Sequence, residues 1–554
     1  MTLLPLGDSA VSVGLGALID EGMAARVRAL AAEIARHPPR GLVDLVPAFA
    51  SVAVFYDINR ISGFERLCAD LEALVTRSED AVVSTTGRRI EIPVTYGGEF
   101  GPDLEAVAAQ TGLRASEVIA SHASADYLVH AIGFMPGFPY LGGLPARLSV
   151  PRQVTPRPNV AAGSVGIGGA QTGIYPVSTP GGWNIIGRTP RRLFDPARAE
   201  PALLRPGDNV KFRAIDALEF ERTFVAEQTL LHGPAEAAAR AEGADISPGI
   251  QVLRAGMFTT VQDLGRTGHR AGGIAVGGAA DAFALRVANL LVGNAETAAG
   301  LEFTLVGPEV VFLHDTVVAV GGAEFGGVPR WQPYAITAGT RVNFGAARSG
   351  CRGYLAIAGG IAVPPVLGSR STHVRAGFGG LQGRPIREGD LIPVPDAVPR
   401  VMGHWRIDER ILPRYSNAPE VRVVAGAERR DFGPELCGPG FKASPQSDRM
   451  GLRLSGPMLA RQTRRELLSS AVAPGTIQIP PDGQPIVLLA DAQTIGGYPQ
   501  AAHVISVDLP VVAQLRPGDT VRFREVALAE AHELALAREH ALAMLREGLA
   551  QKLG

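Results

Sequence analysis

Apolar residues recur along the chain with two periods, and these periods predict how helices and strands alternate. In the first 86 residues, Val11–Leu15 alternates like a strand, whereas Ile19–Ala35 and Phe64–Val75 carry apolar residues at helical spacing. Leu42–Phe55 holds two short apolar runs split by a proline, which is typical of a turn or a bulged strand. We therefore predict a small α/β domain over residues 1–86, in which no residue pattern indicates chemistry.

The stretch from His130 to Arg188 has a different pattern, because glycines and prolines interrupt every apolar run. Twelve glycines lie between Gly133 and Gly187, so no long helix can form there. Short β-branched and aromatic runs predict brief strands joined by tight turns, whose backbone can approach a ligand closely. The polar residues of this stretch are His130, Arg152, Arg157, Gln171, Thr172, Tyr175, Asn184 and Arg188. It is interpreted either as a ligand site or as a barrel wall with exposed arginines.

A second globular unit begins after a region without apolar periodicity. Residues 232–248 are rich in alanine, glycine and charge, and we interpret them as a linker. The sequence that follows is strand-rich, with one helix over Asp281–Val292, and predicts a β domain over residues 249–417. Residues 526–554 carry a leucine and alanine stripe at imperfect heptad spacing, which favours an amphipathic helix that docks on the rest of the chain.

Three phrases of residues 87–231 return, in the same order, in residues 418–525. The phrase LRPGDNVKF at Leu204–Phe212 is nearly copied at Leu515–Phe523, and it predicts a turn followed by a strand. Two shorter pairs also match: Gly163–Val165 with Gly475–Ile477, and Gln171–Pro176 with Gln493–Pro499. The sequence therefore predicts the internal duplication of a β-barrel module.

Composition narrows the class of protein. Hydrophobic residues make up 46% and charged residues 19% of the chain, which describes an ordinary soluble protein, and the net charge of -1 gives no reason to expect a nucleic acid or a membrane as partner. The three cysteines form no CxxC pair, and the N-terminus has no basic region of a signal peptide, so we expect reduced thiols and a cytoplasmic location. Only three of the 53 lysine and arginine residues are lysines, so an anion site must use arginine side chains or backbone N–H groups.

Several common catalytic motifs do not occur in the sequence. It contains no GxSxG, no HExxH, no Gly-Lys dipeptide and no Met-Lys-Met. These absences exclude an α/β-hydrolase nucleophile elbow, a zincin helix, a Walker A loop and a biotinyl-lysine of the usual type. No protein metal site is predicted.

Longer motifs resemble one protein family. Resemblance to the B subunit of bacterial ATP-dependent 5-oxoprolinase is carried by HAIGFMPGFPYLGGLP, AAGSVGIGGAQTGIYP and TPGGWNIIGRTP. Resemblance to its C subunit is carried by TTVQDLGRTGHR, LEFTLVGPEVVF, YLAIAGGIAVPPVLGSRST and QTIGGYPQAAHVISVDLP. The two lie head to tail and cover nearly the whole chain. The resemblance implies cyclophilin-like barrels, so we expect a mainly β fold with α/β parts: two such barrels, the N-terminal α/β domain and the C-terminal helix.

The resemblance also implies an activity. It predicts a component of an enzyme that converts 5-oxoproline, ATP and water to glutamate, ADP and phosphate, with Mg²⁺ bound to the nucleotide. The lactam oxygen would be phosphorylated, and a separate A subunit would complete ring opening. A homo-oligomer is left open. Two alternatives remain: a regulatory protein that binds a histidine kinase, and a biotin-dependent carboxyltransferase that acts on a urea-like amide.

Residues are assigned on the same basis. We expect His130, Arg188, Asp263 and Arg266 to be catalytic, and His130, Gln171 and Arg188 to face Gln262, Asp263 and Arg266 across one cleft. The acidic residues Asp263, Glu302 and Asp448 are the candidates to bind a metal ion or act as a general base. The alternative for each carboxylate is to cap a turn or to form a salt bridge. The residues expected to bind substrate or nucleotide are Phe134, Gly137, Arg152, Arg157, Gln171, Thr172, Tyr175, Gly181, Trp183, Gln262, Glu302, Arg370, Asp448, Arg449, Gln493, Thr494 and Tyr498.

The second half departs from the family pattern at four positions. Ile495 stands where threonine is expected, Ser470 where an acid is more usual, and His269 and Ala275 replace an expected tyrosine and proline. These departures bear on the details of substrate binding more than on the fold.

Overall fold

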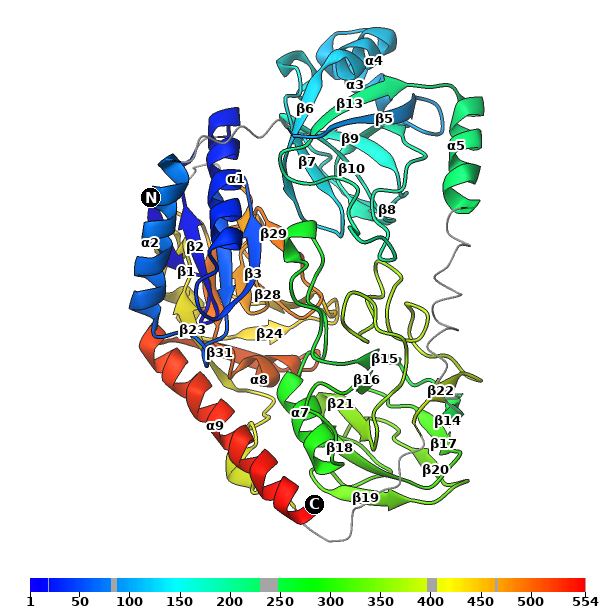
Figure 1. The fold of residues 1–554 in the computed structure, drawn as a ribbon, viewed down its shortest axis with the longest axis vertical. Helices are drawn as coiled ribbons and strands as arrows, with labels where there is room; N and C mark the ends of the chain where they lie inside the picture. The colour runs from blue at the N-terminus through cyan, green and yellow to red at the C-terminus, as the bar shows by residue number, and fades with distance from the viewer. Residues whose placement is uncertain (18, 81–86, 230–247, 396–405, 464–466, 554) are drawn as a thin grey trace.

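The computed structural model of the chain describes residues 1–17, 19–80, 87–229, 248–395, 406–463 and 467–553 (Figure 1). The predicted linker, residues 232–248, lies outside the described residues except for its last position. The fold is mainly β, as predicted, with two closed barrels and a smaller share of helix. Among the described residues, no helix has both the length and the apolar composition needed to cross a membrane.

The N-terminal domain is a four-stranded antiparallel sheet that is covered on both faces. Its strands lie in the order β1 (Thr2–Pro5), β2 (Ala10–Gly14), β4 (Ser51–Tyr56) and β3 (Leu42–Pro47). Helices α1 (Glu21–Arg36) and α2 (Phe64–Asp80) pack on the face that carries Val11, Val13, Val52 and Val54. The opposite face, with Ala53 and Phe55, joins a core shared with both barrels. Because strand residues alternate between the two faces, one sheet can join two separate cores.

The first barrel closes from seven strands around a core of aliphatic and aromatic side chains. Its ring order is β10-β7-β6-β13-β5-β12-β9, in which β13 runs parallel to β5 and the other pairs are antiparallel. A two-stranded sheet of β8 and β11 lies beside it. The bounds are β5 (Arg89–Tyr96), α3 (Leu104–Thr111), α4 (Ala115–Ser124), β6 (Asp126–Ile132), β7 (Pro139–Gly142), β8 (Arg157–Val160), β9 (Ser164–Gly168), β10 (Gln171–Ile174), β11 (Thr179–Gly181), β12 (Asn184–Arg188), β13 (Asn209–Ala214) and α5 (Ala217–Thr229).

The second barrel repeats the first strand for strand. Each barrel has one parallel strand pair, β5 with β13 in the first and β23 with β31 in the second. From that pair, the first barrel runs β5-β12-β9-β10-β7-β6-β13 and the second runs β23-β30-β27-β28-β25-β24-β31, so the strands correspond one to one. The repeated phrase LRPGD leads into β13 and β31, so the predicted duplication is confirmed. The bounds are β23 (Glu420–Ala425), β24 (Phe441–Ala443), β25 (Gly451–Ser455), β26 (Ser470–Ala471), β27 (Thr476–Gln478), β28 (Ile486–Leu488), β29 (Ile495–Gly496), β30 (Gln500–Val504), α8 (Leu509–Ala513) and β31 (Thr520–Glu525).

One of the three predicted sequence matches between the barrels is wrong. Strand β10, which begins at Gln171, corresponds to β28, so Gln493–Pro499 is not its counterpart. The backbone of Thr494 instead pairs with Val472, as Thr179 pairs with Val160. The equivalent phrases are therefore Thr-Pro-Gly-Gly-Trp at 179–183 and Thr-Ile-Gly-Gly-Tyr at 494–498. The other match was suggested by Gln-Thr at the start and Tyr-Pro at the end of both phrases, but the strand pairing decides which residues are equivalent.

Between the barrels in sequence lies a domain of two packed sheets. A four-stranded sheet, β20-β17-β14-β22, and a five-stranded sheet, β15-β16-β21-β18-β19, enclose one apolar core, and helix α7 (Ala282–Leu291) covers the outer face of the larger sheet. The strand bounds are β14 (Pro248–Arg254), β15 (Phe258–Gln262), β16 (Gly300–Thr304), β17 (Glu309–Phe312), β18 (Thr316–Glu324), β19 (Pro333–Ile336), β20 (Arg341–Asn343), β21 (Ser349–Ile357) and β22 (Leu391–Pro393). We call this the middle domain.

The C-terminal helix α9 (Leu528–Leu553) docks on several domains at once, as predicted (Figure 1). Its apolar residues are not confined to one stripe, because Ala531 and Leu542 are buried whereas Leu536 and Met544 are exposed. His532 lies 3.0 Å from the Tyr56 hydroxyl of the N-terminal domain. Glu539 forms a bidentate ion pair with Arg286 of the middle domain, and Ala531 packs beside Ile505 of the second barrel. The helix therefore ties the first domain of the chain to the last.

Candidate functional site

A cavity of about 560 Å³ lies where the two barrels face each other. The first barrel contributes Phe134, Phe138, Tyr140, Arg152, Gln153, Val154, Pro156, Tyr175, Pro180, Gly181, Gly182 and Trp183. The second barrel contributes Asp448, Met450, Gly451, Arg453, Gln478, Ile486, Leu488, Gln493 and Tyr498, and the middle domain adds Arg375. We call this cavity the central cleft. It unites the two halves of the chain, and small-ligand sites favour such boundaries between domains.

The wall from the first barrel is a cluster of aromatic rings centred on Phe138. Its ring centroid lies 5.5 Å from Phe134, 5.2 Å from Tyr140, 5.3 Å from Tyr175 and 5.6 Å from Trp183, in each case edge to face. Burial raises the pKa of Tyr175 to about 12, so its hydroxyl stays protonated at neutral pH. Edge-to-face packing holds the rings in fixed orientations, and together they offer a rigid apolar surface to a ligand.

Glycines make room for this cluster. A Cβ atom added to Gly168 would stand 2.8 Å from the Trp183 indole, and one added to Gly173 would stand 2.9 Å from the same ring. Phe134 itself adopts a φ of 66°, a left-handed conformation that costs free energy in any residue other than glycine. Strained backbone of this kind gathers at ligand sites, where the surrounding structure enforces it. The glycine-rich motif therefore shapes the aromatic wall.

The rest of the cleft is polar and mostly cationic. The guanidinium of Arg152 lies 5.7 Å from the centre of the Trp183 ring, at the edge of the aromatic wall. Arg375 and Arg453 are also exposed at the cleft, and Arg375 lies 3.8 Å from the carboxylate of Asp448. Three cations against one carboxylate suit a ligand that carries negative charge.

Trp183 and Tyr498 occupy equivalent positions in the two barrels, yet their environments differ. Trp183 is 5% exposed, whereas Tyr498 is 47% exposed. The two barrels differ on the neighbouring strand, where the first barrel has Gly166 and the second has Gln478 at the equivalent position. The Gln478 side chain takes the space in the second barrel, and its amide reaches the Tyr498 carbonyl at 3.5 Å. The second barrel therefore offers amide and hydroxyl groups where the first offers an aromatic wall.

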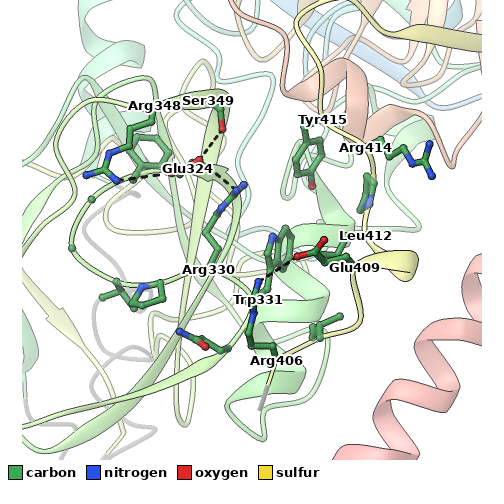
Figure 2. A pocket seen from close by; sticks show the side chains of 18 of the residues that line it. Glu324, Arg330, Trp331, Arg348, Ser349, Arg406, Glu409, Leu412, Arg414 and Tyr415 are labelled. Carbon is green, nitrogen blue, oxygen red and sulfur yellow. Dashed lines mark hydrogen bonds and ion pairs between the residues drawn. The ribbon is translucent and has the colours of Figure 1, made fainter. Parts of the chain in front are cut away.

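Two further chambers adjoin the central cleft, and one cavity does not. A chamber of about 1040 Å³ shares the lining residues Arg152 and Tyr498 with the central cleft. Gln171 also lines this chamber. Another, of about 500 Å³, shares Asp448 and reaches Arg449 in the seam between the second barrel and the middle domain. A cavity on the far side of the middle domain, shown in Figure 2, shares no lining residue with the cleft.

Several predicted site residues of the first half lie elsewhere. Arg157 forms a bidentate ion pair with Asp103, at 2.5 and 2.7 Å, which holds the loop before α3. Thr172 is fully buried and contacts His122 at 3.0 Å inside the barrel. Arg188 donates from Nε to the carbonyl of Ala162 at 2.8 Å. These three residues line none of the cavities described above, so their contacts are structural.

His130 is placed at the contact with the N-terminal domain. Its ring stacks on Phe49 at 5.6 Å between centroids, and its buried Nδ1 has no hydrogen-bond partner among the residues that the structure describes. Burial, and next the charge of Arg28, lower the pKa of His130, so the ring is neutral near pH 7. It is one layer removed from the cleft, behind Tyr140, which contacts the same Phe49 ring at 5.5 Å.

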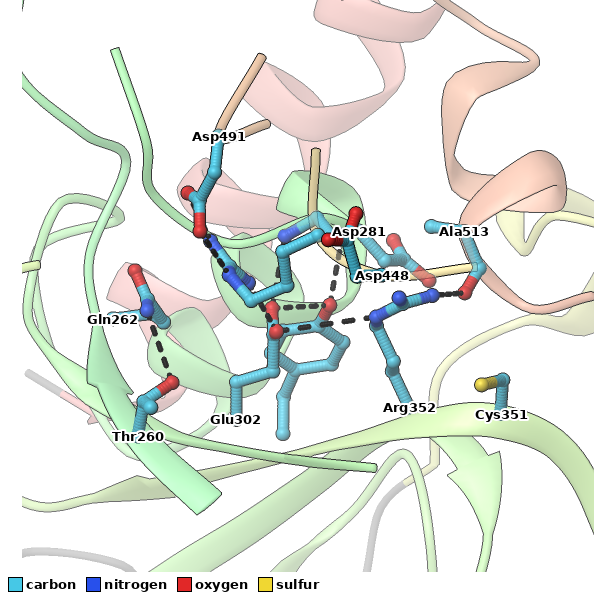
Figure 3. A network of polar contacts seen from close by, with 12 residues as sticks. Thr260, Gln262, Asp281, Glu302, Cys351, Arg352, Asp448, Asp491 and Ala513 are labelled. Atoms are coloured by element: carbon cyan, nitrogen blue, oxygen red, sulfur yellow. Dashed lines mark hydrogen bonds and ion pairs between the residues drawn. The ribbon is translucent and has the colours of Figure 1, made fainter. Parts of the chain in front are cut away.

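Glu302, one of the three predicted acids, is held in a buried network of polar contacts (Figure 3). Glu302 pairs with Arg449 and accepts from the Tyr354 hydroxyl at 2.8 Å, while Arg449 also binds Asp491 at 2.8 Å. Arg449 and Asp491 belong to the second barrel and Glu302 to the middle domain, so this network joins the two. Asp448 alone of the three offered acids lies exposed at the cleft.

Asp263 supports a turn, as the alternative interpretation has it. Its carboxylate accepts from the Gly265 and Arg370 backbone N–H groups, at 2.8 and 2.6 Å, and from two serine hydroxyls. Gln262 is fully buried beside the same segment. Arg266 is 1% exposed with its guanidinium 4.9 Å from the Phe378 ring. We predicted that two sets of residues face each other across one cleft, and this prediction is therefore wrong. The sets were His130, Gln171 and Arg188 in the first half, and Gln262, Asp263 and Arg266 in the second.

The loop after His130 does contact the second half, through its backbone. The N–H of Gly137 donates to the carbonyl of Gly272 at 2.9 Å. A Cβ atom on Gly133 would stand 2.7 Å from Ile495, and one on Gly273 would stand 2.5 Å from the Met135 carbonyl. Ile495, one of the four departures, thus packs in an apolar core with this loop, where its extra methyl groups find contacts. Thr494 beside it is buried, and its hydroxyl has no hydrogen-bond partner.

Several cleft residues were not predicted, among them Phe138, Tyr140, Arg375, Arg453 and Gln478. Phe138 and Tyr140 lie within the predicted glycine-rich motif, so its alternating aromatic residues were an available signal. A correct alignment of the two barrels would have indicated Gln478, because it replaces a glycine. No local pattern marks Arg375 or Arg453, which only the approach of three domains brings to the cleft.

Comparisons with known proteins match both halves of the chain. The model described as carboxyltransferase domain, subdomain C and D, matches residues 1–204, and that of subdomain A and B matches residues 272–525. The B subunit of 5-oxoprolinase from Bacillus subtilis is 47% identical over 225 residues, which are 39% of this chain and 93% of that protein. The C subunit of 5-oxoprolinase from Escherichia coli is 42% identical over 295 residues, 51% of this chain and 93% of that protein. The crystal structure of TTHA0988 aligns with a TM-score of 0.79 at 35% identity and covers 93% of this chain and 99% of its own.

Proposed function

Because the chain belongs to the carboxyltransferase-domain family that contains the B and C subunits of 5-oxoprolinase, we propose that it is a fused B and C component of an ATP-dependent 5-oxoprolinase. The observation that carries the proposal is the central cleft, which takes its walls from both halves. A fused chain keeps the two halves at high effective concentration, and this helps only if they form one site.

The substrate would lie against the aromatic wall. The lactam ring of 5-oxoproline is small and nearly flat, so it fits beside Phe138, Tyr175 and Trp183. Its carboxylate would be bound by Arg152, which already lies at the edge of the Trp183 ring. Gln493 and Tyr498 of the opposite barrel supply amide and hydroxyl donors for the lactam oxygen.

The phosphoryl donor would occupy the cationic side of the cleft. Phosphoryl transfer is catalysed mainly by positioning and charge neutralisation, and Arg375 and Arg453 are the exposed cations there. A nucleotide-bound Mg²⁺ needs only one or two protein carboxylates, and Asp448 is a fitting ligand; the ion would neutralise phosphate charge. Among the described residues, no group of three or more acidic, histidine or cysteine side chains is arranged to hold a metal.

The reaction would proceed in two stages. The lactam oxygen attacks the γ-phosphorus of ATP, the bond to the β-phosphate oxygen breaks, and ADP leaves. The phosphorylated lactam is a far better electrophile than an amide, so water then adds at its ring carbon. The C–N bond of this adduct breaks, with the nitrogen leaving as the amine, and the former ring carbon becomes an acyl phosphate. A second water then displaces phosphate to give glutamate, and we assign this stage of ring opening to a separate A subunit. A nucleotide-dependent reaction of this kind is consistent with a cytoplasmic location.

The test is reconstitution with a purified A subunit from the same genome. We expect glutamate formation that requires 5-oxoproline, ATP and both proteins, with one ADP released for each glutamate. Arg152→Ala should reduce the turnover, whereas Arg66→Ala, which changes an exposed arginine of the N-terminal domain, should not. Glutamate formation by the chain alone would overturn the division of labour. Carboxylation of a urea-like amide with added biotinyl carrier, in place of lactam turnover, would overturn the substrate assignment.

A further inference from the structure

The cavity on the far side of the middle domain has a volume of about 990 Å³ and lies between the β18–β19 turn and residues 406–415 (Figure 2). Its volume is in the range of small-molecule sites. It shares no lining residue with the central cleft, and none of the family motifs assigns a role to it. We call it the arginine cavity.

One wall of the arginine cavity is a segment fixed at both ends. Near its start, the N–H of Ile407 donates to the Trp331 carbonyl at 3.3 Å. At its end, the Tyr415 hydroxyl donates to the carboxylate of Asp281 at 2.6 Å. Ile407 and Leu412 pack in the same apolar cluster as the Trp331 ring. The wall is therefore held in place without a ligand, so binding would order little additional chain.

The cavity has a surplus of positive charge. Arg330, Arg348, Arg406, Arg410 and Arg414 line it, against Glu324 and Glu409 in the lining and Asp408 beside it, which pairs with Arg410. Glu324 lies 3.6 Å from Arg330 and 3.9 Å from Arg348, too far for short charge-assisted hydrogen bonds. Arg414 is exposed and forms no ion pair with any other residue that the structure describes. The chain as a whole has a net charge of -1, so this surplus is local.

Beneath the arginines lies an apolar floor. Phe325, Val328 and Trp331 are buried at 5%, 5% and 9% exposure, and all three line the cavity. Trp331 has a φ of 61°, the same left-handed strain that Phe134 shows at the central cleft. An apolar floor with an arginine rim fits a ligand that joins a ring to two or more anionic groups.

We propose that the arginine cavity binds a nucleoside di- or triphosphate, with its base on the floor at Trp331 and its phosphates on the arginine rim. This site is separate from the central cleft, so its occupancy does not depend on the chemistry assigned there. A nucleotide bound here would report the nucleotide supply to an enzyme component that, under the proposed function, consumes ATP elsewhere.

The test uses tryptophan fluorescence, because the chain has only three tryptophans. In the full-length Trp183→Phe/Trp405→Phe variant the signal comes from Trp331. We expect ADP to quench this signal saturably, and adenosine or pyrophosphate alone to bind at least tenfold more weakly. The affinity should fall as salt rises, since the contacts at the rim are electrostatic. Pyrophosphate binding as tight as that of ADP would overturn the role of the floor.

Charge removal completes the test. In the same tryptophan background, Arg348→Ala/Arg414→Ala should weaken the ADP binding that Trp331 fluorescence reports at least tenfold. The melting temperature should be unchanged, because both side chains are exposed. Arg66→Ala is the matched control on an exposed arginine. Unchanged ADP binding in the double variant would overturn the site. Loss of ADP binding in Arg152→Ala, with full binding in the double variant, would also overturn it and would support nucleotide binding in the cleft instead.

Discussion

Trp183 and Tyr498 occupy equivalent positions in the two barrels and line the same cleft from opposite sides. Each follows a Thr-x-Gly-Gly phrase, and each threonine is buried with a hydroxyl that finds no hydrogen-bond partner in the described part of the chain. One duplicated loop thus supplies both walls. The copies have diverged because Gly166 leaves space beside the Trp183 Cβ atom, whereas the Gln478 side chain occupies the equivalent position, where the tyrosine is exposed. We infer that this divergence separates an apolar half-site from a polar one.

Removal of the cation at the aromatic wall should affect catalysis and not stability. We expect Arg152→Ala to lower kcat/KM for A-subunit-dependent lactam hydrolysis by about 10- to 100-fold, since a hydrogen bond to a charged group contributes about 1.5–3 kcal/mol. The side chain is exposed, so the melting temperature should stay within about 1–2 °C. Calorimetry and a coupled glutamate assay measure both. A loss of activity that is accompanied by a clear drop in melting temperature would show that Arg152 has a structural role.

Arg157, only five residues later, should behave in the opposite way. Its guanidinium binds both carboxylate oxygens of Asp103, which also accepts from the Ile185 N–H at 2.6 Å. Arg157→Ala leaves this mostly buried carboxylate without its cation, and we expect a loss of about 1–3 kcal/mol after allowance for the partly exposed arginine. Arg157→Lys should restore little, because an ammonium cannot bind bidentately. A normal melting temperature with lost activity would return Arg157 to the site.

The Arg449 network should be essential to the seam between the second barrel and the middle domain. Arg449→Ala leaves Glu302 and Asp491 without their shared cation in a buried place, at an expected cost of about 3–5 kcal/mol. Arg453→Ala, four residues later on the same hairpin and exposed, should change stability by less than about 0.5 kcal/mol. Differential scanning calorimetry distinguishes the two. Similar melting profiles for both variants would contradict a structural role of the network.

Buried histidines should make the fold sensitive to acid. Burial lowers the pKa of His122 to about 3 and that of His503 to about 4, from an ordinary value near 6.5. The unfolded chain therefore binds more protons than the folded one between these values. Stability from each histidine is fully present above pH 6.5 and falls by about 1.4 kcal/mol per pH unit as the pH drops toward 4.

Melting temperatures measured between pH 7.5 and pH 4.5 check this prediction. His122→Gln keeps a polar side chain beside Tyr96 and Thr172 but cannot be protonated, so it should flatten the acid limb of the curve. His540→Gln, on the C-terminal helix, is the control. An acid limb of the same slope in His122→Gln would exclude this histidine as a cause.

The sequence alone determined the elements and their repetition. Apolar periodicity predicted the helices of the N-terminal domain and α9, because a side chain's face depends only on its position along a helix or strand. The copied phrase Leu204–Phe212 predicted the second barrel, since a turn and the strand after it depend on local residues. The glycine-rich motif also predicted part of the cleft, including Arg152, Tyr175 and Trp183, because glycine leaves space for large neighbours.

Only the tertiary structure decided which of the candidate residues meet. Arg152 and Arg157 are alike in sequence, but a buried carboxylate 54 residues upstream binds one and leaves the other at the cleft. Asp263 and Asp448 are likewise indistinguishable until the segment from Ser369 to Ser371 encloses the first. Arg375 and Tyr498 come to one cavity from different domains. Whether a charged side chain is free or paired depends on contacts between segments distant in sequence, and local pattern carries no information about those contacts.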